Sequence, residues 1–167
     1  MRSCSDVHNF LLEEGVAHEI IHLPALATTA HRAADQLGVA VSDIVKSLVF
    51  ATENGPVVAL VPGDRTANLP RLRAALGCRR LALAGPAEVL DVTGYRPGAV
   101  PPCGLALDLP MVADPACFAP EVVYCGGGTT TTMLRIRGED LRTVLGARVA
   151  AIADAPQNGS AAPAAQG

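Results

Sequence analysis

The chain has 167 residues, of which 50% are apolar and 17% are charged, and its formal net charge at pH 7 is −3. This length predicts one domain that buries roughly two-thirds of its unfolded surface. The apolar content excludes a disordered chain, and no apolar run approaches the roughly 18 residues of a membrane span. Because the sequence does not open with a basic segment followed by an apolar stretch, we expect no secretory signal, no membrane partner and a cytoplasmic location.

Helices are predicted where a capping residue precedes apolar residues at helical spacing. Ser5 is the predicted cap of the first helix, and the five predicted helices span about residues 5–14, 29–37, 69–76, 86–92 and 138–145. Short strands are predicted from β-branched and apolar runs between turn residues. They span about residues 18–23, 44–51, 57–61, 79–83, 105–109, 112–113, 121–125, 129–137 and 148–153. Nothing in residues 5–38 indicates chemistry, so we expect that segment to serve as scaffold.

The order of these elements predicts the fold class. About eight short strands and three to five helices, joined mostly as hairpins, are typical of an α+β domain. We expect a curved mixed β-sheet or a small β-barrel flanked by helices. Residues 1–153 form the predicted domain, and residues 154–167, rich in Ala, Pro, Gln and Gly, form a predicted disordered tail.

Basic residues are unevenly distributed and almost all of one type. Residues 64–98 carry six arginines and three acidic residues, whereas the flanking segments are acidic overall. This segment is either a solvated surface or a weak phosphate contact with a nucleic acid. A protein that coats DNA would be far more basic, so DNA is not an expected partner. Twelve of the thirteen basic residues are arginines, and the single lysine is Lys46.

Lys46 lies inside the predicted strand 44–51, on the same face as Ile44, Leu48 and Phe50. An ammonium group in that place either protects an exposed sheet edge against aggregation or points into a pocket. In a cramped pocket, a compact positive charge suits a phosphate or a developing oxyanion. The strand pattern leaves both interpretations open.

Two glycine-containing segments are candidates for ligand contact. Residues 93–104 hold three glycines and three prolines, which indicates a loop of defined shape with backbone N–H groups exposed at Gly98, Ala99 and Val100. Such a loop is either a tight connection or a device that polarises a carbonyl group. The run at 126–128 is three consecutive glycines, which form either a hairpin turn or a point of close approach for a backbone or ligand.

The sequence carries no recognisable nucleophile-and-base motif. The five cysteines lack metal-ligand spacing and are expected to be free thiols, and no histidine follows His31. Cys103 and Cys125 flank the glycine segments and are either nucleophiles or buried small apolar residues. We predict no metal and no cofactor.

Three features taken in order resemble a known family. They are the strand Ile44-Val45-Lys46-Ser47-Leu48-Val49-Phe50, the loop Gly94-Tyr95-Arg96-Pro97-Gly98-Ala99-Val100-Pro101-Pro102-Cys103-Gly104, and the run Cys125-Gly126-Gly127-Gly128. Together they resemble the YbaK/prolyl-tRNA synthetase-associated editing domain family over about residues 5–153. The resemblance implies a YbaK-like curved sheet or barrel and a free-standing hydrolase that acts on wrongly charged aminoacyl-tRNA.

The resemblance also implies roles for individual residues. Lys46 corresponds to the family lysine that holds the 3′-terminal phosphate or orients the ester, and Gly98 and Pro102 correspond to the loop that presents backbone donors to the carbonyl. Ser47 is in a position to touch the ligand. The expected site therefore has Lys46 and Gly98 as catalytic groups, and the following residues bind substrate: Ser47, Ala99, Val100, Pro102, Gly104, Gly126, Gly127 and Gly128.

The implied function is deacylation of a small amino acid from tRNA, in the family's manner without a protein nucleophile or metal. The expected partners are aminoacyl-tRNA, with a tRNA of proline type as one candidate, and an aminoacyl-tRNA synthetase. Two alternatives stay open: a non-catalytic module that binds tRNA or a synthetase, and a thiol- or metal-dependent hydrolase. Some alanine-editing relatives have a late histidine near the pocket, which this sequence lacks, so that chemistry is not transferred.

Overall fold

The computed structural model describes residues 1–157. In this part of the chain the helices are α1 (Cys4–Glu13), α2 (Ala30–Leu37), α3 (Leu69–Leu76), α4 (Pro86–Thr93) and α5 (Gly138–Leu145). The strands are β1 (His18–His22), β2 (Ile44–Thr52), β3 (Gly55–Pro62), β4 (Leu81–Leu83), β5 (Met111–Ala113), β6 (Val122–Gly126), β7 (Thr132–Arg137) and β8 (Arg148–Val149). None of the helices in residues 1–157 combines the length and apolar character that crossing a bilayer requires.

The strands form one mixed sheet in the order β1-β7-β6-β2-β3-β5-β8, with β4 paired to β2. The pairs β2–β6, β3–β5 and β5–β8 are parallel, and the other neighbours are antiparallel. Among the described residues β1 and β8 remain the outer strands, so the sheet does not close into a barrel. The predicted α+β class is confirmed. Of the two predicted architectures, the structure has the mixed sheet flanked by helices and not the closed barrel.

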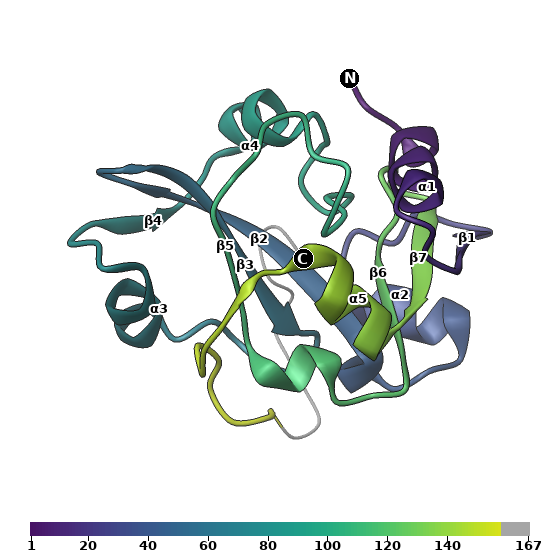
Figure 1. The fold of residues 1–167 in the computed structure, drawn as a ribbon. Helices are drawn as coiled ribbons and strands as arrows, with labels where there is room; N and C mark the ends of the chain where they lie inside the picture. Colours follow the sequence, from purple (N-terminus) through teal and green to yellow (C-terminus); the bar gives the residue numbers. More distant parts are fainter. Residues whose placement is uncertain (158–167) are drawn as a thin grey trace.

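Strand β2 connects the two ends of the molecule. Its first residues pair with β6 (Ile44 opposite Tyr124), and its last residues pair with β4 (Phe50 opposite Leu83), while β3 pairs along its whole length. Figure 1 shows the hairpin tip extending to one side with β4 and α3, whereas α1, α2, β1 and β7 gather at the other end. The start of β2 therefore lies where segments far apart in sequence meet.

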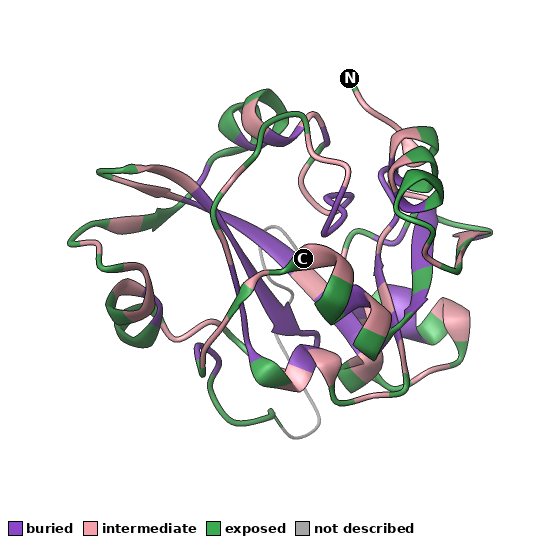
Figure 2. Cartoon of the chain, in the orientation of Figure 1, coloured by how far each residue is buried: buried purple, intermediate pink, exposed green. Residues whose placement is uncertain are grey.

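The two faces of β2 contribute to different parts of the core. Val45 and Val49 belong to the cluster that includes residues of α1, α4 and α5. Leu48 and Phe50 pack in a second cluster with α3, and Ile44 joins a third cluster with the alanines of α2. Figure 2 shows the hairpin buried along its middle and more exposed at its tip. The alternation of β2 thus buries both faces, which explains its nearly continuous apolar sequence.

The predicted start of the first helix is wrong by two residues. Ser3 rather than Ser5 caps α1, because the Ser3 side chain accepts a hydrogen bond from the Ser5 N–H. The Asp6 carboxylate in turn accepts a hydrogen bond of 2.8 Å from the Ser3 N–H. This reciprocal arrangement is a capping box, in which aspartate replaces the usual glutamate.

Three strand predictions also need correction. Residues 105–109 form no strand, since the Ala106 N–H donates to the Thr93 carbonyl and Pro110, next in the chain, has no N–H. The threonine-rich strand begins at Thr132 rather than 129, because Thr129 and Thr132 hydrogen bond to each other within a turn. Residues 148–153 contribute only β8 and an isolated bridge between Ala67 and Ala153.

The start of the predicted disordered tail is hydrogen bonded to the domain. The Asp154 N–H donates to the Thr66 carbonyl and the Gln157 N–H donates to the Asp64 carbonyl, each at 2.9 Å. Residues 154–157 therefore lie against the loop that follows β3. The rest of the predicted tail, residues 158–167, lies outside the described residues.

Candidate functional site

A small hollow of about 30 Å³, here named the β2 hollow, lies at the start of β2. Five residues predicted for the site line it together: Lys46, Ser47, Gly98, Val100 and Gly126. They come from β2, the loop after α4 and the end of β6, three segments that the parallel pairing of β2 with β6 brings together. Its other lining residues are Ala27, Thr29, Ala30, Ala33, Ile44, Val45 and Met133.

The turn after β3 holds the ammonium group of Lys46. Gly63 donates its N–H to the Ile44 carbonyl at 2.7 Å, and a Cβ atom there would lie 2.5 Å from the Val41 oxygen, so the chain folds closely over β2. The turn brings the Arg65 carbonyl oxygen to 2.8 Å from the Lys46 Nζ, which donates a hydrogen bond to it. An ammonium group has three protons, and this is the one hydrogen bond that it donates within residues 1–157.

Burial lowers the pKa of Lys46 from its ordinary value, and the nearby Asp64 carboxylate partly offsets this effect. The single ion pair among residues 1–157 joins Arg2 to Asp6, so no carboxylate contacts the ammonium group directly. Lys46 therefore carries a partly buried positive charge that is not neutralised by contact. Such a charge is suited to attract an anionic group of a ligand.

Three buried side-chain atoms have no hydrogen-bond partner in the described part of the chain: His31 Nδ1, Ser47 Oγ and Asp64 Oδ1. Ser47 lies on the wall of the β2 hollow and is only 5% exposed. His31 is on α2, which contributes other residues to the hollow, and Asp64 is in the turn that holds Lys46. Because buried polar atoms are nearly always paired, the unpaired Ser47 hydroxyl on the wall of the hollow indicates a site built for a ligand.

Gly98 brings the proline-containing loop against the segment that precedes α2. Its φ of +82° is in the left-handed region, and a Cβ atom would lie 3.3 Å from the Thr28 carbonyl oxygen. Among residues 1–157, the Gly98 N–H has no hydrogen-bond partner. The expected donor at Ala99 is not available, because its N–H donates to the Arg96 carbonyl at 3.0 Å. The turn over residues 97–99 directs the Val100 N–H back toward the carbonyls at its own start. Of the three predicted backbone donors, the Gly98 N–H thus remains free for a ligand.

The glycine run allows backbones to approach one another. A Cβ atom on Gly126 would lie 2.4 Å from the Val100 carbonyl oxygen, and one on Gly127 would lie 2.6 Å from the Thr132 carbonyl carbon. The Gly128 N–H donates to the Ala99 carbonyl at 3.0 Å. Gly126 therefore reaches the β2 hollow, whereas Gly127 packs against the start of β7 and Gly128 hydrogen bonds to the loop at Ala99.

Pro102 and Gly104 are not brought to the β2 hollow. They line a larger hollow of about 610 Å³, here named the α1 hollow, on the side of the loop that faces α1. Its wall includes Phe10 of α1 and Leu145 of α5. The proline-containing loop therefore borders two hollows, and of its residues Gly98 and Val100 line the one that contains Lys46, whereas the predicted Ala99 does not.

The cysteines do not supply a nucleophile to the β2 hollow. All five are free, and Cys103, Cys117 and Cys125 are buried. Burial raises the pKa of Cys103 to about 12 and raises that of Cys125 well above its ordinary value. The expectation that Cys103 and Cys125 are buried small apolar residues is confirmed. In the part of the chain that the structure describes, no three His, Cys, Asp or Glu side chains are grouped to hold a metal ion.

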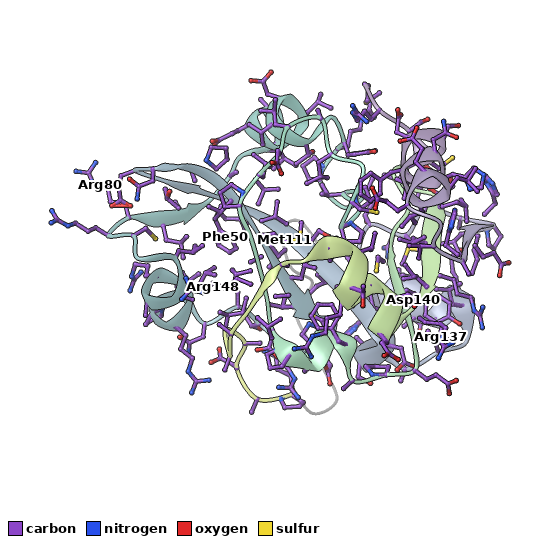
Figure 3. The ribbon with its side chains drawn as sticks, in the orientation of Figure 1. Phe50, Arg80, Met111, Arg137, Asp140 and Arg148 are labelled. Carbon is purple, nitrogen blue, oxygen red and sulfur yellow. The ribbon has the colours of Figure 1, made fainter. Side chains whose placement is uncertain are left out.

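Two arginines of the arginine-rich segment lie at the tip of the β2–β3 hairpin. Arg79 and Arg80 lie just before β4, and their main-chain N–H groups donate to the Glu53 carboxylate at the hairpin tip. Figure 3 shows the Arg80 side chain projecting away from the body of the molecule. Because Lys46 is near the start of β2 and Glu53 follows its end, these arginines lie far along the strand from the hollow.

The prediction that residues 5–38 are scaffold only is wrong for α2. Ala27, Ala30 and Ala33 line the β2 hollow, together with Thr29, whose side chain caps α2. The spacing of three residues between Ala30 and Ala33 was the available signal, since it places small side chains on one face of α2, whereas Ala27 lies in the segment before the helix. The Arg65 carbonyl was also missed, because a main-chain contact leaves no mark in the residue type.

Comparison with known proteins decides the family. The sequence model of the aminoacyl-tRNA editing domain matches residues 24–144. The chain belongs to the aminoacyl-tRNA editing domain family. The family resemblance is thereby confirmed, and the β2 hollow lies within the matched segment of this editing domain.

The curated relatives are much longer than the editing domain. A proline–tRNA ligase of Thermosipho melanesiensis is 37% identical over 102 residues, which are 61% of this chain and 18% of the relative. One of Citrifermentans bemidjiense is 42% identical over 99 residues, which are 59% of this chain and 17% of the relative. The chain thus matches less than about a fifth of the length of these relatives.

Solved structures match the whole fold. One is described as a candidate trans-editing enzyme for prolyl-tRNA synthetase, with 33% identity and a TM-score of 0.85 over 93% of this chain and 99% of that protein. A second, described as hypothetical protein APE2540, has 29% identity and a TM-score of 0.84, and covers 89% of this chain and 99% of that protein. These matches confirm the YbaK-like fold of the editing domain.

Proposed function

We propose that this editing domain hydrolyses the ester bond of mischarged aminoacyl-tRNA and works as a free-standing enzyme. The observation that carries the proposal is the β2 hollow itself, where the Lys46 ammonium, the Ser47 hydroxyl and the unpartnered Gly98 N–H meet on a largely apolar wall. Support for free-standing action comes from the structural neighbour of matching extent, which is described as a candidate trans-editing enzyme. Residues 1–153 act as a single editing domain.

The reaction needs little more than charge stabilisation. A water molecule attacks the ester carbonyl, the bond to the 3′ oxygen of the terminal ribose breaks, and this oxygen takes a proton. The products are a free amino acid and a tRNA with a free 3′ hydroxyl. Of the described residues that line the hollow, none is a carboxylate, imidazole or thiol, so the protein's contribution is to bind and polarise the ester.

Lys46 and Gly98 are the proposed catalytic residues. Negative charge develops on the carbonyl oxygen during attack, and the N–H group of Gly98 is free to donate to it. The Lys46 ammonium holds either the terminal phosphate or this developing charge. Donors fixed in advance on a rigid loop stabilise charge more effectively than mobile water does.

The β2 hollow restricts the amino acid to a small one. Its volume of about 30 Å³ leaves little room beyond a methyl or hydroxymethyl group, and Ala27, Ala30 and Ala33 form much of its wall. Larger residues at these helix positions would fill the space. The buried Ser47 hydroxyl is left to bind a polar atom of the substrate. We therefore propose alanine, serine, threonine or cysteine esters as the substrate class.

The relatives suggest the partner. Both curated relatives are proline–tRNA ligases, so we propose a tRNA of proline type as the first acceptor to test and a prolyl-tRNA synthetase as a candidate partner. Because aminoacyl-tRNA is made and used in the cytoplasm, we expect the activity there. The remaining predicted binding residues, Pro102 and Gly104, border the α1 hollow and support the loop instead of touching the ester.

The proposal is tested with a panel of tRNAs of several acceptor types, each esterified with alanine, serine, threonine, cysteine or proline. Release of the amino acid is measured with the protein in excess and compared with the rate without protein. We expect faster release for at least one small amino acid on one tRNA, and no acceleration for correctly charged prolyl-tRNA. If tRNA binds but no ester in the panel is released faster than without protein, the alternative of a non-catalytic binding module replaces the proposal.

A further inference from the structure

We infer that Arg2 is a positioning residue for the loop that carries Gly98. This inference rests on the proposed function, because it assigns Arg2 a role in presenting that loop to the ester. Arg2 lies outside the segment 24–144 that matches the editing-domain family.

Arg2 binds both ends of the segment 94–104. Its main-chain N–H donates to the Gly94 carbonyl at 2.8 Å, and its guanidinium group donates to the Gly104 carbonyl at 3.3 Å. The fully buried Tyr95 donates its hydroxyl to the same Gly104 oxygen at 2.6 Å. These three hydrogen bonds close the loop at its base.

The glycines at the two ends allow this approach. Gly94 and Gly104 have φ angles of +85° and +70°, a conformation that side chains disfavour. A Cβ atom on Gly94 would lie 2.9 Å from the Arg2 Cγ atom, and one on Gly104 would lie 3.2 Å from the Asp6 carbonyl oxygen. The loop sequence is thus adapted to the N-terminal segment at both ends.

Helix α1 anchors Arg2. The Asp6 carboxylate lies 3.6 Å from the Arg2 guanidinium and also accepts the Ser3 N–H in the capping box. Val7 and Leu11 bury the inner face of α1 in the main core cluster. The loop is therefore tied to a helix that is itself packed on the sheet.

The N-terminal segment also supports the middle of the loop, through Gly128. A Cβ atom on Gly128 would lie 2.9 Å from the main chain at Ser3 and Cys4, so the glycine run packs directly on the start of α1. The Gly128 N–H in turn donates to the carbonyl of Ala99, the neighbour of Gly98. The N-terminal segment thus supports the loop at both ends and, through Gly128, beside the proposed backbone donor.

The test uses the full chain with Arg2→Met, which removes the guanidinium group but keeps the main-chain hydrogen bond and an unbranched side chain against Gly94. Arg2→Lys restores a cation for Asp6. Arg148→Met is the matched control, since Arg148 is an exposed arginine on β8, away from the loop. Two quantities are measured for each protein: amide hydrogen exchange in residues 94–104, and single-turnover deacylation of the best panel substrate over a range of protein concentrations.

For Arg2→Met we expect faster exchange in residues 94–104 and a rate constant at saturation about tenfold lower, because small displacements of aligned groups are costly. The concentration for half-maximal rate should change less than twofold, and Arg2→Lys should recover most of the rate. Unchanged exchange, or faster exchange with an unchanged rate, would overturn the inference, as would an equal loss in Arg148→Met. If the wild-type protein deacylates nothing, the proposed function itself fails, which is a distinct result.

Discussion

The Lys46 ammonium group donates a 2.8 Å hydrogen bond to the main-chain carbonyl oxygen of Arg65. A carbonyl partner orients the ammonium group and leaves its charge in place. A carboxylate in contact with the group would neutralise that charge. The strand thereby keeps a directed positive charge beside the unpartnered Ser47 hydroxyl and the free N–H group of Gly98. This relationship underlies the expected behaviour of variants at the site.

Replacement of Lys46 by arginine should not preserve activity. A planar guanidinium group on a longer side chain cannot occupy the space of a compact ammonium group between β2 and the turn at Arg65. We expect Lys46→Arg to fold and to lose at least about tenfold in single-turnover deacylation, equivalent to about 1.4 kcal/mol. Full activity in this variant would indicate that the residue only protects a sheet edge.

The deacylation rate should begin to fall at a lower alkaline pH than it would if Lys46 had the pKa of an ordinary lysine. Burial lowers the pKa of Lys46, so its proton is lost as the pH rises through a value below 10.5. If the charged form of Lys46 is required, the deacylation rate decreases as the pH rises through the pKa of Lys46. The uncatalysed hydrolysis rate is subtracted at each pH. Single-turnover rates measured from pH 6 upward test this expectation.

Asp64→Asn is the informative comparison for the pH profile. The Asp64 carboxylate raises the pKa of Lys46 against the effect of burial, so its removal should move the alkaline decrease to still lower pH. The activity at the acidic end of the range should change little. A profile that stays in place in this variant would argue against titration of Lys46 as the cause.

Gly98→Ala tests the loop. An alanine at φ +82° is strained by about 1 to 2 kcal/mol, and its Cβ would crowd the Thr28 carbonyl oxygen at 3.3 Å. Gly77→Ala, at φ +66° with open space around it, is a matched control on α3. Both variants should lose stability in thermal unfolding, but only Gly98→Ala should lose about tenfold or more in deacylation. Equal activities in the two variants would remove Gly98 from the site.

Cys103→Ala and Cys125→Ala should remain active. Burial raises the pKa of both thiols, so almost no thiolate is present near neutral pH, and neither residue lines the β2 hollow. We expect each variant to keep deacylation within about threefold of wild type, a difference below 1 kcal/mol, and EDTA to have little effect. Abolition of activity in a folded cysteine variant, or by EDTA, would favour the thiol- or metal-dependent hydrolase instead.

Local sequence signals predicted the parts of the site that lie on single elements. The β-branched run around Lys46 identified β2, and the glycines and prolines at 93–104 identified a loop of fixed shape. Capping residues also indicated the starts of α2 and α3: the sequence offers Thr28 or Thr29 for α2, of which Thr29 is the cap, and Asn68 for α3. Each of these signals depends on residues close together in the chain, which is why the sequence alone was sufficient.

Contacts between distant segments could not be predicted in the same way. The parallel pairing of Ile44 with Tyr124 brings Gly126 to the loop, and no local pattern encodes that partner choice. The use of the Ala99 N–H within its own turn and the role of α2 in the hollow likewise depend on tertiary packing. Residues 105–109 are the reverse case, in which a strand was predicted but does not form. Their apolar pattern is typical of a strand, yet the segment pairs with no neighbouring strand.

The most direct test of the account compares single-turnover deacylation of one mischarged tRNA by wild type, Lys46→Ala and the exposed-arginine control Arg148→Ala, at one salt concentration. Melting temperatures of all three proteins establish that each is folded. The account predicts a loss of about thirtyfold to a thousandfold in Lys46→Ala, equivalent to about 2 to 4 kcal/mol of transition-state stabilisation, and a near-normal rate in Arg148→Ala. A near-normal rate in folded Lys46→Ala would contradict the assignment of the β2 hollow as the site of ester hydrolysis.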